Sequence, residues 1–337
     1  MTKLAGIIPP LVTPFTADEE VDEAALRADV RYMIEQAGVH GLVVGGSTGE
    51  GHTLTTDELR CVVGAAVEEA AGRVPVLAGL IVDSTRQAVE RVRALADLKV
   101  AALQVTPVHY LFRPLDDMMV RHFAAIAQAG RAAVMIYNVV PWSYCAPALL
   151  VRIMTEVDGV IGVKQSAGDL KLMADLLLML DGRGLVMSAV DALLYPSFVL
   201  GAHGAIAALL TAAPIQCVQL WDAVQRGDHA TALDLHKRLL RLWNTLVGDN
   251  LPANVKYAMS LQGRDGGFPR APMAPSSETQ QVAIRAAMTE TILLKPLRVV
   301  SVGQSRDAKE EHMVTGIAPT EESMVVVFVN DDTDNFA

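Results

Sequence analysis

The sequence predicts an α/β protein, a (β/α)8 TIM barrel with a C-terminal helical appendage. Eight short runs rich in Val, Ile and Leu alternate with eight longer amphipathic segments, and together they fill about 220 residues, the size of such a barrel. The runs are apolar on both faces, which is typical of buried parallel strands rather than of a half-exposed antiparallel sheet. No G-x-G-x-x-G motif opens the helix after the first run, so a doubly wound nucleotide-binding sheet is the weaker alternative.

The predicted strands and helices alternate along residues 1–226, which we expect to form the barrel. The strand candidates lie at residues 5–10, 41–46, 74–80, 100–107, 132–138, 159–165, 184–190 and 204–209. The helix candidates lie at residues 22–37, 56–71, 84–97, 115–129, 146–156, 169–180, 191–200 and 214–226. The second helix has a clear start, because Thr55 and Glu58 form a T-x-x-E capping box.

Beyond the eighth unit the pattern changes. Residues 227–296 predict a helical appendage of the same domain. Its helix candidates lie at 228–247, 251–262 and 277–293. Residues 297–337 form an acidic extension of unknown structure, and the part from residue 307 onward carries eight acidic residues against a single lysine.

Composition limits the partners that we expect. The formal net charge is −10, which argues against a nucleic-acid partner because phosphate binding needs a basic face. The N-terminal segment is a short apolar run broken by prolines, which fits neither a secretory signal nor a membrane span. The cysteines, Cys61, Cys145 and Cys217, are far apart and form no C-x-x-C pair, as expected of a reducing compartment. We therefore expect a cytoplasmic protein with no membrane partner.

Polar side chains at the ends of the predicted strands are the candidates for chemistry, since barrel enzymes place their sites there. Lys164 follows an apolar run, and a lysine in such a place is either paired with an acid or desolvated. A desolvated lysine has a lowered pKa and can attack a carbonyl to form a Schiff base, whereas pairing with Asp191 or Glu50 would make it a scaffold residue. Tyr137 is a phenol that could relay protons to such a lysine, although a core tyrosine bonded to the backbone is the commoner case.

The segment GGSTGE at residues 45–50 allows two interpretations. Ser47 stands in a G-x-S-x-G pattern, which is typical of a serine hydrolase, with Asp191 and His203 following in the required order. However, a hydrolase elbow starts its helix directly after the serine, and here the capping signal comes only at Thr55. Glycines beside two hydroxyls are better suited to holding a carboxylate. The histidines include no metal-binding pair such as H-E-x-x-H, so we expect no metal.

Four motifs resemble those of a known superfamily, in order and in spacing, from about residue 4 to about residue 293. They are GIIPPLVTPF at 6–15, GGSTGE at 45–50, YNVVP at 137–141 and GVKQSAGD at 162–169. The chain resembles the dihydrodipicolinate synthase and N-acetylneuraminate lyase superfamily of class I, Schiff-base-forming (β/α)8 enzymes. The resemblance implies a homotetramer that acts on pyruvate or another 2-oxo acid and needs neither a metal nor an organic cofactor.

The resemblance also implies the roles of individual residues. Lys164 would form the imine and Tyr137 would relay protons. Ser47 and Thr48, with the adjacent Gly46, would bind the substrate carboxylate, and Ser47 would help to link the relay. Two further positions would line the 2-oxo-acid site, Ala189 and Ile206.

Two departures from the synthase pattern concern the second substrate. The synthases have an arginine shortly after the YN motif that takes a distant carboxylate, and here Trp142 and Ser143 follow Pro141 instead. An indole cannot replace a bidentate guanidinium, so Trp142 predicts a more apolar or sugar-stacking pocket. In the loop after the fourth strand, either His109 or Tyr110 stands where a neighbouring subunit's tyrosine would enter the relay.

These observations predict a class I aldolase or lyase that acts on a 2-oxo acid through an imine of Lys164. A true dihydrodipicolinate synthase, condensing pyruvate with aspartate semialdehyde, is the first alternative. A dehydratase or deaminase of a hydroxylated 2-oxo acid uses the same imine chemistry. From another class, a non-catalytic 2-oxo-acid-binding protein is the remaining alternative, ahead of the hydrolase.

Overall fold

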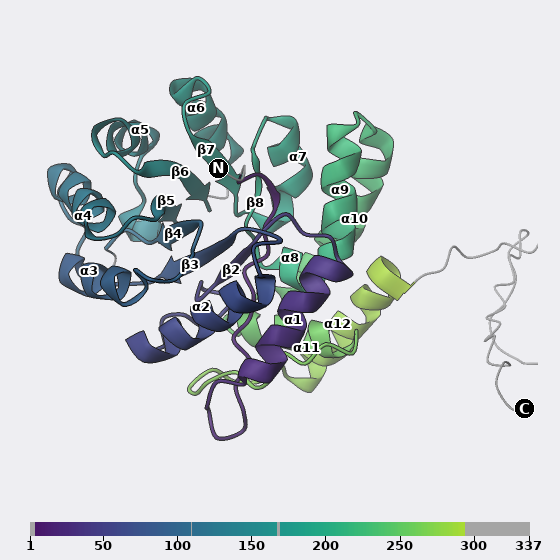
Figure 1. Ribbon diagram of the computed structural model, residues 1–337. Helices are drawn as coiled ribbons and strands as arrows, with labels where there is room; N and C mark the ends of the chain where they lie inside the picture. The colour runs from purple at the N-terminus through teal and green to yellow at the C-terminus, as the bar shows by residue number, and fades with distance from the viewer. Residues whose placement is uncertain (1–3, 109, 167–168, 294–337) are drawn as a thin grey trace, which may run out of the picture. The chain divides into compact units, whose positions relative to one another are not determined.

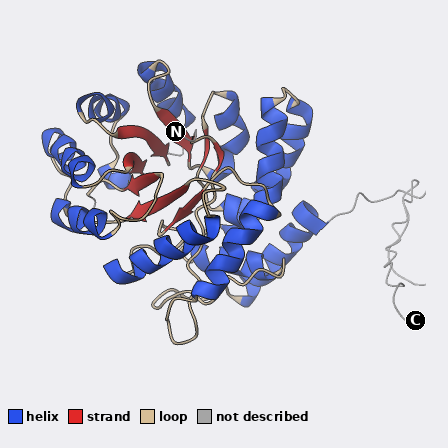
Figure 2. Cartoon of the chain, in the orientation of Figure 1, coloured by secondary structure: helices blue, strands red, loops and turns tan. Residues whose placement is uncertain are grey.

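The computed structural model describes residues 4–108, 110–166 and 169–293. Their core is a parallel eight-stranded sheet with the strand order β1-β8-β7-β6-β5-β4-β3-β2. Helices lie around the outside of the strands (Figures 1 and 2). The predicted (β/α)8 fold is therefore confirmed.

The sheet closes into a barrel through the segment that follows β1. Pro10 forms an isolated parallel bridge with Val43 of β2. The Leu11 N–H donates to the Val43 carbonyl at 2.8 Å, and the Val43 N–H donates to the Pro9 carbonyl at 3.0 Å. These bonds complete the ring between the first and second strands, so that neither strand is left as an open edge.

The strands occupy the positions that the apolar runs predict. They are β1 (Gly6–Ile7), β2 (Leu42–Val44), β3 (Val76–Leu80), β4 (Ala102–Val105), β5 (Ala133–Asn138), β6 (Val160–Gln165), β7 (Leu185–Ser188) and β8 (Gly204–Ala205). The barrel helices are α1 (Glu23–Glu35), α2 (Thr56–Ala70), α3 (Thr85–Ala94), α4 (Asp116–Ala129), α5 (Pro147–Glu156), α6 (Leu170–Leu180), α7 (Leu194–Val199), α8 (Leu209–Ala212) and α9 (Pro214–Gln225). Two short 3-10 turns, η1 (Pro141–Ser143) and η2 (Asp191–Leu193), follow β5 and β7.

The capping box at the start of α2 is present as the sequence predicts. The Glu58 N–H donates to the Thr55 hydroxyl, and the Glu58 carboxylate accepts from the Thr55 N–H at 2.8 Å. The helix therefore starts nine residues after Ser47 rather than immediately after it. This late start removes the geometry of a hydrolase elbow.

The aliphatic residues fill two layers. A small cluster occupies the barrel interior, with members on the strands or beside them: Leu4, Ile8, Val43, Leu77, Ala102, Met135, Met187 and Ile206. A much larger cluster lies between the strands and the surrounding helices. Side chains alternate between these layers because successive residues of a strand point to opposite faces. Filling both layers requires runs that are apolar on both faces, as this sequence has.

Beyond the barrel, three helices follow as predicted: α10 (His229–Leu246), α11 (Leu251–Ser260) and α12 (Glu278–Met288). A π-helical turn, η3 (Thr289–Leu293), extends α12. Helix α10 packs against α9 and α12, and α11 packs against α8 and α12. The acidic extension predicted at 297–337 lies outside the described residues, and the boundaries at 226 and 296 stay predictions.

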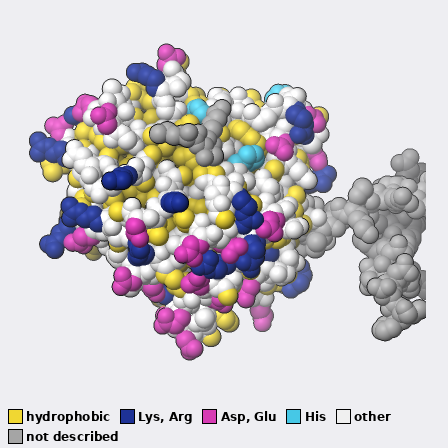
Figure 3. Space-filling model, in the orientation of Figure 1, with side chains coloured by type: hydrophobic (Ala, Val, Ile, Leu, Met, Phe, Trp, Pro, Cys, Tyr) yellow, Lys and Arg dark blue, Asp and Glu magenta, His cyan; other side chains and the backbone are white. Residues whose placement is uncertain are grey.

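Helices of the described chain are amphipathic or short, and none is long and apolar enough to cross a membrane. On the face that Figure 3 shows, Lys and Arg are interspersed with Asp and Glu and separated by apolar atoms. This face presents no continuous basic patch of the kind that nucleic-acid binding uses.

Candidate active site

A small cavity of about 140 Å3 lies at the carboxyl ends of the strands, where barrel enzymes carry their sites. Its walls come from the loops after β2, β7 and β8, from the ends of β5 and β6, and from the start of α11. The lining residues are Ser47, Thr48, Tyr137, Lys164, Ala189, Asp191, Ile206, Ala207, Ala208, Leu251 and Pro252. Cavities for drug-sized ligands occupy about 300–1,000 Å3, so this one suits a molecule of few heavy atoms.

The loop after β2 presents the Ser47 and Thr48 hydroxyls to this cavity. Gly45 has a φ of 70°, a left-handed conformation that glycine adopts without strain. Gly51 passes so close to Gly45 that a Cβ at Gly51 would lie 1.9 Å from the Gly45 carbonyl oxygen. The Gly51 N–H closes the turn by donating to the Gly46 carbonyl at 2.9 Å. The glycines of the motif therefore form a tight turn that carries two hydroxyls.

Tyr137 and Lys164 lie side by side on adjacent strands of the barrel, because they are paired in the register of β5 and β6. The Lys164 Nζ lies 3.7 Å from the centroid of the Tyr137 ring. The Ser47 hydroxyl donates to the Tyr137 hydroxyl at 3.3 Å. Three residues that are far apart in the sequence thus form one contiguous group.

Lys164 is buried, and none of the described residues forms an ion pair with its amine. The side chain is 3% exposed, and it makes no ion pair or hydrogen bond with any other residue in the described part of the chain. Burial lowers the pKa of Lys164 to about 7, and the nearby Asp191 carboxylate opposes this shift. A substantial fraction of the amine is therefore neutral and nucleophilic near neutral pH.

Tyr137 is also desolvated. Burial raises the pKa of its phenol, the side chains of Ser47 and Ser166 oppose the shift, and the charge of Asp191 adds to it. The phenol therefore stays protonated at neutral pH. A protonated phenol within contact of a neutral amine can donate a proton and later recover it.

Asp191, at the start of η2, is the acidic member of the cavity. Its Oδ1 accepts the Leu209 N–H at 2.6 Å, at the start of α8. Burial raises the pKa of Asp191 to about 6, against the lowering effects of that N–H and of Lys164. The Asp191 carboxylate therefore holds the start of α8 and partly offsets the effect of burial on the Lys164 amine.

The structure gives Glu50 a partner other than Lys164. The Lys256 Nζ, on α11, donates to Glu50 Oε1 at 2.7 Å, and both side chains are buried. The other carboxylate oxygen accepts the Arg270 N–H at 2.9 Å. The idea that Glu50 pairs with Lys164 is therefore wrong, because Glu50 is already saturated by residues of the C-terminal segment.

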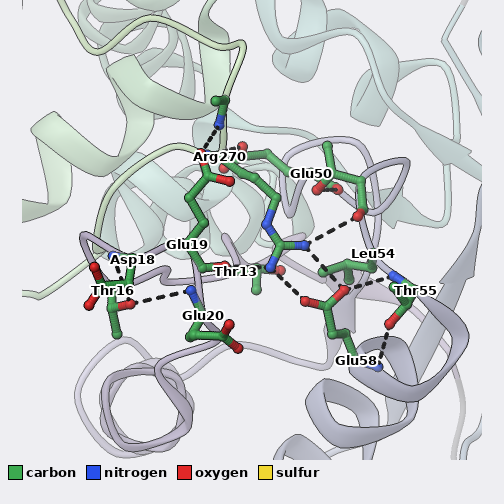
Figure 4. A network of polar contacts seen from close by, with 12 residues as sticks. Thr13, Thr16, Asp18, Glu19, Glu20, Glu50, Leu54, Thr55, Glu58 and Arg270 are labelled. Carbon is green, nitrogen blue, oxygen red and sulfur yellow. Dashed lines mark hydrogen bonds and ion pairs between the residues drawn. The ribbon is translucent and has the colours of Figure 1, made fainter.

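The Arg270 side chain extends this network along the same loop. Its guanidinium donates to Glu58 Oε1 at 2.6 Å (Figure 4). It also donates to the Thr53 carbonyl at 3.2 Å. Glu58 also caps α2 through Thr55. The loop that carries Ser47 and Thr48 is thus fixed at its far end to helix α2 and to the segment around Arg270.

Not every residue that the sequence analysis nominates reaches the cavity. Gly46 shapes the turn but does not line the cavity. Tyr110 is 66% exposed and Trp142 is 61% exposed, and the Trp142 indole N–H donates to the Tyr110 carbonyl at 2.8 Å. His109 lies outside the described residues. The roles of Tyr110, His109 and Trp142 in the relay and second-substrate pocket stay predictions.

Four lining residues were not nominated by the sequence analysis. Ala207 and Ala208 follow Ile206, while Leu251 and Pro252 begin α11. None of them has a polar side chain that could mark it as a site residue. Within the described residues, no group of three or more His, Cys, Asp or Glu is arranged to hold a metal ion.

A (β/α)8 barrel with a desolvated amine and a phenol at its strand ends is the arrangement of a class I aldolase-type enzyme. Comparison with known proteins leads to the same class. The model of the dihydrodipicolinate synthetase family matches residues 3–291. The chain belongs to this family and is a lyase of the class I aldolase type.

Individual relatives cover nearly all of the described chain. A 4-hydroxy-tetrahydrodipicolinate synthase of Bradyrhizobium diazoefficiens is 38% identical over 298 residues, which are 87% of this chain and 98% of the relative. The structure of YagE from Escherichia coli K12, a prophage protein of the dihydrodipicolinic acid synthase family in complex with pyruvate, has a TM-score of 0.82 at 26% identity, covering 86% of this chain and 99% of that chain. The dihydrodipicolinate synthase of Acinetobacter baumannii, complexed with pyruvate, has a TM-score of 0.80 at 28% identity and the same coverage.

Proposed function

We propose that this lyase forms an imine between Lys164 and the keto carbon of pyruvate or a closely related 2-oxo acid. The observation that carries the proposal is the buried Lys164 amine, which lies 3.7 Å from the Tyr137 ring and has no ion-pair partner among the described residues. Two structural relatives are complexes with pyruvate, which supports a substrate of this size.

The neutral amine attacks the keto carbon and forms a carbinolamine. Two N–H protons and the former keto oxygen then leave as one molecule of water, and the C=N bond of the imine forms. Tyr137 supplies the proton that the departing oxygen needs and recovers one from the nitrogen. When the imine nitrogen takes up one further proton from solvent, the resulting iminium withdraws electrons from the adjacent carbon, so that this carbon can lose a proton or break a bond to its neighbour.

The turn after β2 supplies the carboxylate site. Ser47 and Thr48 line the same cavity as Lys164, and their hydroxyls can donate hydrogen bonds to an anion. Ala189 and Ile206 line the same cavity with apolar side chains, against which a methyl or methylene group could pack. A 2-oxo acid has this pattern of a carboxylate, a carbonyl and a short apolar end.

Reductive trapping tests the proposal directly. The protein is incubated with pyruvate and borohydride and digested, and the peptides are weighed by mass spectrometry. The adduct is expected on the peptide that contains Lys164 and not on the one that contains Lys256, which is equally buried but ion-paired. If neither pyruvate nor any other 2-oxo acid gives an adduct on Lys164, the imine hypothesis is wrong.

A specific observation favours one second candidate, the synthesis of 4-hydroxy-tetrahydrodipicolinate from pyruvate and aspartate semialdehyde. Curated relatives with 34–38% identity carry that name. Against it, the segment after β5 offers the exposed indole of Trp142 where the synthases place an arginine. An assay with pyruvate and aspartate semialdehyde separates the candidates, and we expect turnover well below that of an arginine-bearing relative.

We further propose a homotetramer in the cytoplasm. The loop after β4 exposes a group of large apolar side chains, as expected of a subunit interface: Tyr110, Leu111, Phe112 and Leu115. Cys61, Cys145 and Cys217 are free thiols, which supports a reducing compartment. Analytical ultracentrifugation measures the assembly, and a monomer at micromolar concentration would contradict the tetramer.

A further inference from the structure

Glu50 has a strained backbone within the turn that carries Ser47 and Thr48. It stands two positions after Thr48, and its φ of 53° lies in the left-handed region that residues other than glycine rarely adopt. The Glu50 N–H donates to the Ser47 carbonyl at 3.0 Å, so the strained residue helps to close the turn that presents the two hydroxyls. Such a conformation costs free energy and persists only where the surrounding structure enforces it.

The Glu50 side chain is the part of this residue that its surroundings hold. It is fully buried, and each carboxylate oxygen has its own partner in the C-terminal segment. Oε1 accepts from the Lys256 Nζ at 2.7 Å, and Oε2 accepts from the Arg270 N–H at 2.9 Å. The side chain therefore cannot turn away without losing charge-assisted hydrogen bonds, which are stronger than neutral ones.

Lys256 belongs to the helix that supplies another part of the cavity wall. Helix α11 begins with Leu251 and Pro252, which line the same cavity as Ser47 and Thr48. Lys256 lies about one helical turn further along α11 than Pro252. Its ion pair with Glu50 therefore joins the chain segment with the hydroxyl donors to the chain segment with this apolar wall.

We propose that the ion pair of Glu50 and Lys256 positions the turn with Ser47 and Thr48 relative to α11, and thereby sets the affinity of the cavity for a 2-oxo acid. The inference rests on the proposed function, because it requires this turn to bind the substrate carboxylate. Glu50 and Lys256 are positioning residues, since neither of them lines the cavity. Without the pair, the left-handed conformation of Glu50 loses its support, and the two hydroxyls move away from the carboxylate.

A second buried ion pair provides a matched control. The Arg264 guanidinium donates to Asp29 Oδ1 at 2.7 Å and 3.0 Å, and both side chains are buried. This pair also joins the C-terminal segment to the barrel, but it does so at α1, and neither residue lines the cavity. Loss of either pair should destabilise the fold, whereas only loss of the pair at Glu50 should weaken substrate binding.

The test compares Glu50→Gln with Asp29→Asn, each of which replaces a buried carboxylate by an amide of the same shape. Borohydride trapping on Lys164 over a range of pyruvate concentrations gives the half-saturating concentration and the yield of adduct at saturation. For Glu50→Gln we expect the half-saturating concentration to rise about tenfold, because misplacing a substrate-positioning group by about 1 Å costs up to about 10²-fold. The yield at saturation should equal that of the wild type. Asp29→Asn should leave both quantities unchanged, although chemical denaturation should show a loss of stability similar to that of Glu50→Gln.

A double variant separates positioning from stability. Glu50→Gln combined with Lys256→Met leaves neither charge of the pair buried, so it should recover part of the lost stability and supply a folded protein if Glu50→Gln alone does not fold. Its half-saturating concentration should stay raised, because the link between the turn and α11 is still absent.

Three results would overturn the proposal. Glu50→Gln could bind pyruvate like the wild type, Asp29→Asn could weaken binding equally, or the double variant could recover affinity together with stability. A wild type that forms no adduct would refute the imine and this proposal with it. An adduct in the wild type, together with an unchanged half-saturating concentration in Glu50→Gln, would refute only the positioning role.

Discussion

Lys164 and Lys256 are equally buried, but among the described residues only Lys256 has an ion-pair partner. Lys164, in β6, is 3% exposed and has no ion-pair partner among the described residues, and burial lowers its pKa to about 7. Lys256, in α11, is 4% exposed and donates to Glu50 at 2.7 Å and to the Phe268 carbonyl. Burial also lowers the pKa of Lys256, but the charge and hydrogen bond of Glu50 oppose the shift.

The comparison shows that burial alone does not make a lysine nucleophilic. The cost of desolvation acts on both amines, and a close carboxylate offsets it at only one of them. An amine that keeps its proton in an ion pair holds two segments together, here the loop after β2 and the segment from α11 to Arg270. An amine without such a partner gives up its proton and can react.

The largest expected effect comes from Lys164→Met. Removing the nucleophile should abolish the borohydride-trapped adduct and reduce turnover by a factor on the order of 10⁴ or more. Its stability should be unchanged or higher at neutral pH, because the variant no longer buries an amine that is costly to protonate. Thermal unfolding and an activity assay check both parts, and a strongly destabilised Lys164→Met would mean that the amine is a scaffold residue.

The stability of the wild type and that of Lys164→Met should depend differently on pH. The pKa of Lys164 is about 7 in the folded state and 10.5 for an ordinary lysine, so between these values the unfolded chain binds more protons. The stability of the wild type should therefore fall as the pH is lowered from about 10.5 to about 7. Lys164→Met should lack this component of the pH dependence.

Lys256→Met, in contrast to Lys164→Met, should lower the stability of the fold. Among the described residues it leaves the buried Glu50 carboxylate with the Arg270 N–H alone, and breaking a buried pair costs about 3–5 kcal/mol of unfolding free energy. Chemical denaturation measures the loss. The double variant Glu50→Met with Lys256→Met should recover part of it, because no unpaired charge stays buried. Equal destabilisation in the single and double variants would show that the ion pair is not the reason.

The sequence predicts the barrel well because its signal is local and repeated. Every predicted strand and barrel helix is present, since apolar runs and amphipathic segments report burial directly. The strand in the run 204–209 is shorter than predicted, because it ends at Ala205 and the chain becomes helical from Leu209. The Asp191 carboxylate accepts the Leu209 N–H from 18 residues away, and local periodicity cannot show such a cap.

The candidate site is predictable to the extent that it depends on strand ends. Ser47, Tyr137 and Lys164 meet because their strands end at the same rim, and each stands at the end of an apolar run or directly after it. The pairing of Glu50 with Lys256 is hidden, because it joins residues 206 positions apart.

A smaller effect, on the pH dependence of imine formation, is expected from Asp191→Asn. The variant removes the carboxylate near Lys164, so the surroundings of Lys164 differ even more from those of the ion-paired Lys256. The Asp191 carboxylate raises the pKa of Lys164 against the effect of burial, so its removal should lower that pKa below about 7. The amide oxygen can still accept the Leu209 N–H and hold α8 in place. The rate of imine formation rises as the amine loses its proton, and this rise should move to lower pH. A pH–rate profile that does not move would show that Asp191 is electrostatically unimportant to the amine.

The smallest effect that we expect is that of Ser47→Ala, which leaves the amine untouched and alters only its surroundings. The variant loses one carboxylate donor and the hydrogen bond to the Tyr137 hydroxyl at 3.3 Å. Turnover of the 2-oxo acid should fall by about tenfold, a loss of roughly 1.4 kcal/mol in transition-state stabilisation. The adduct on Lys164 should still form, because burial and not Ser47 lowers the pKa of the amine. Thr48→Val is the matched variant, since Thr48 lines the same cavity but is not bonded to Tyr137. If Ser47→Ala turns over like the wild type, Ser47 neither binds the carboxylate nor belongs to the relay, and the reactivity of Lys164 depends on its burial alone.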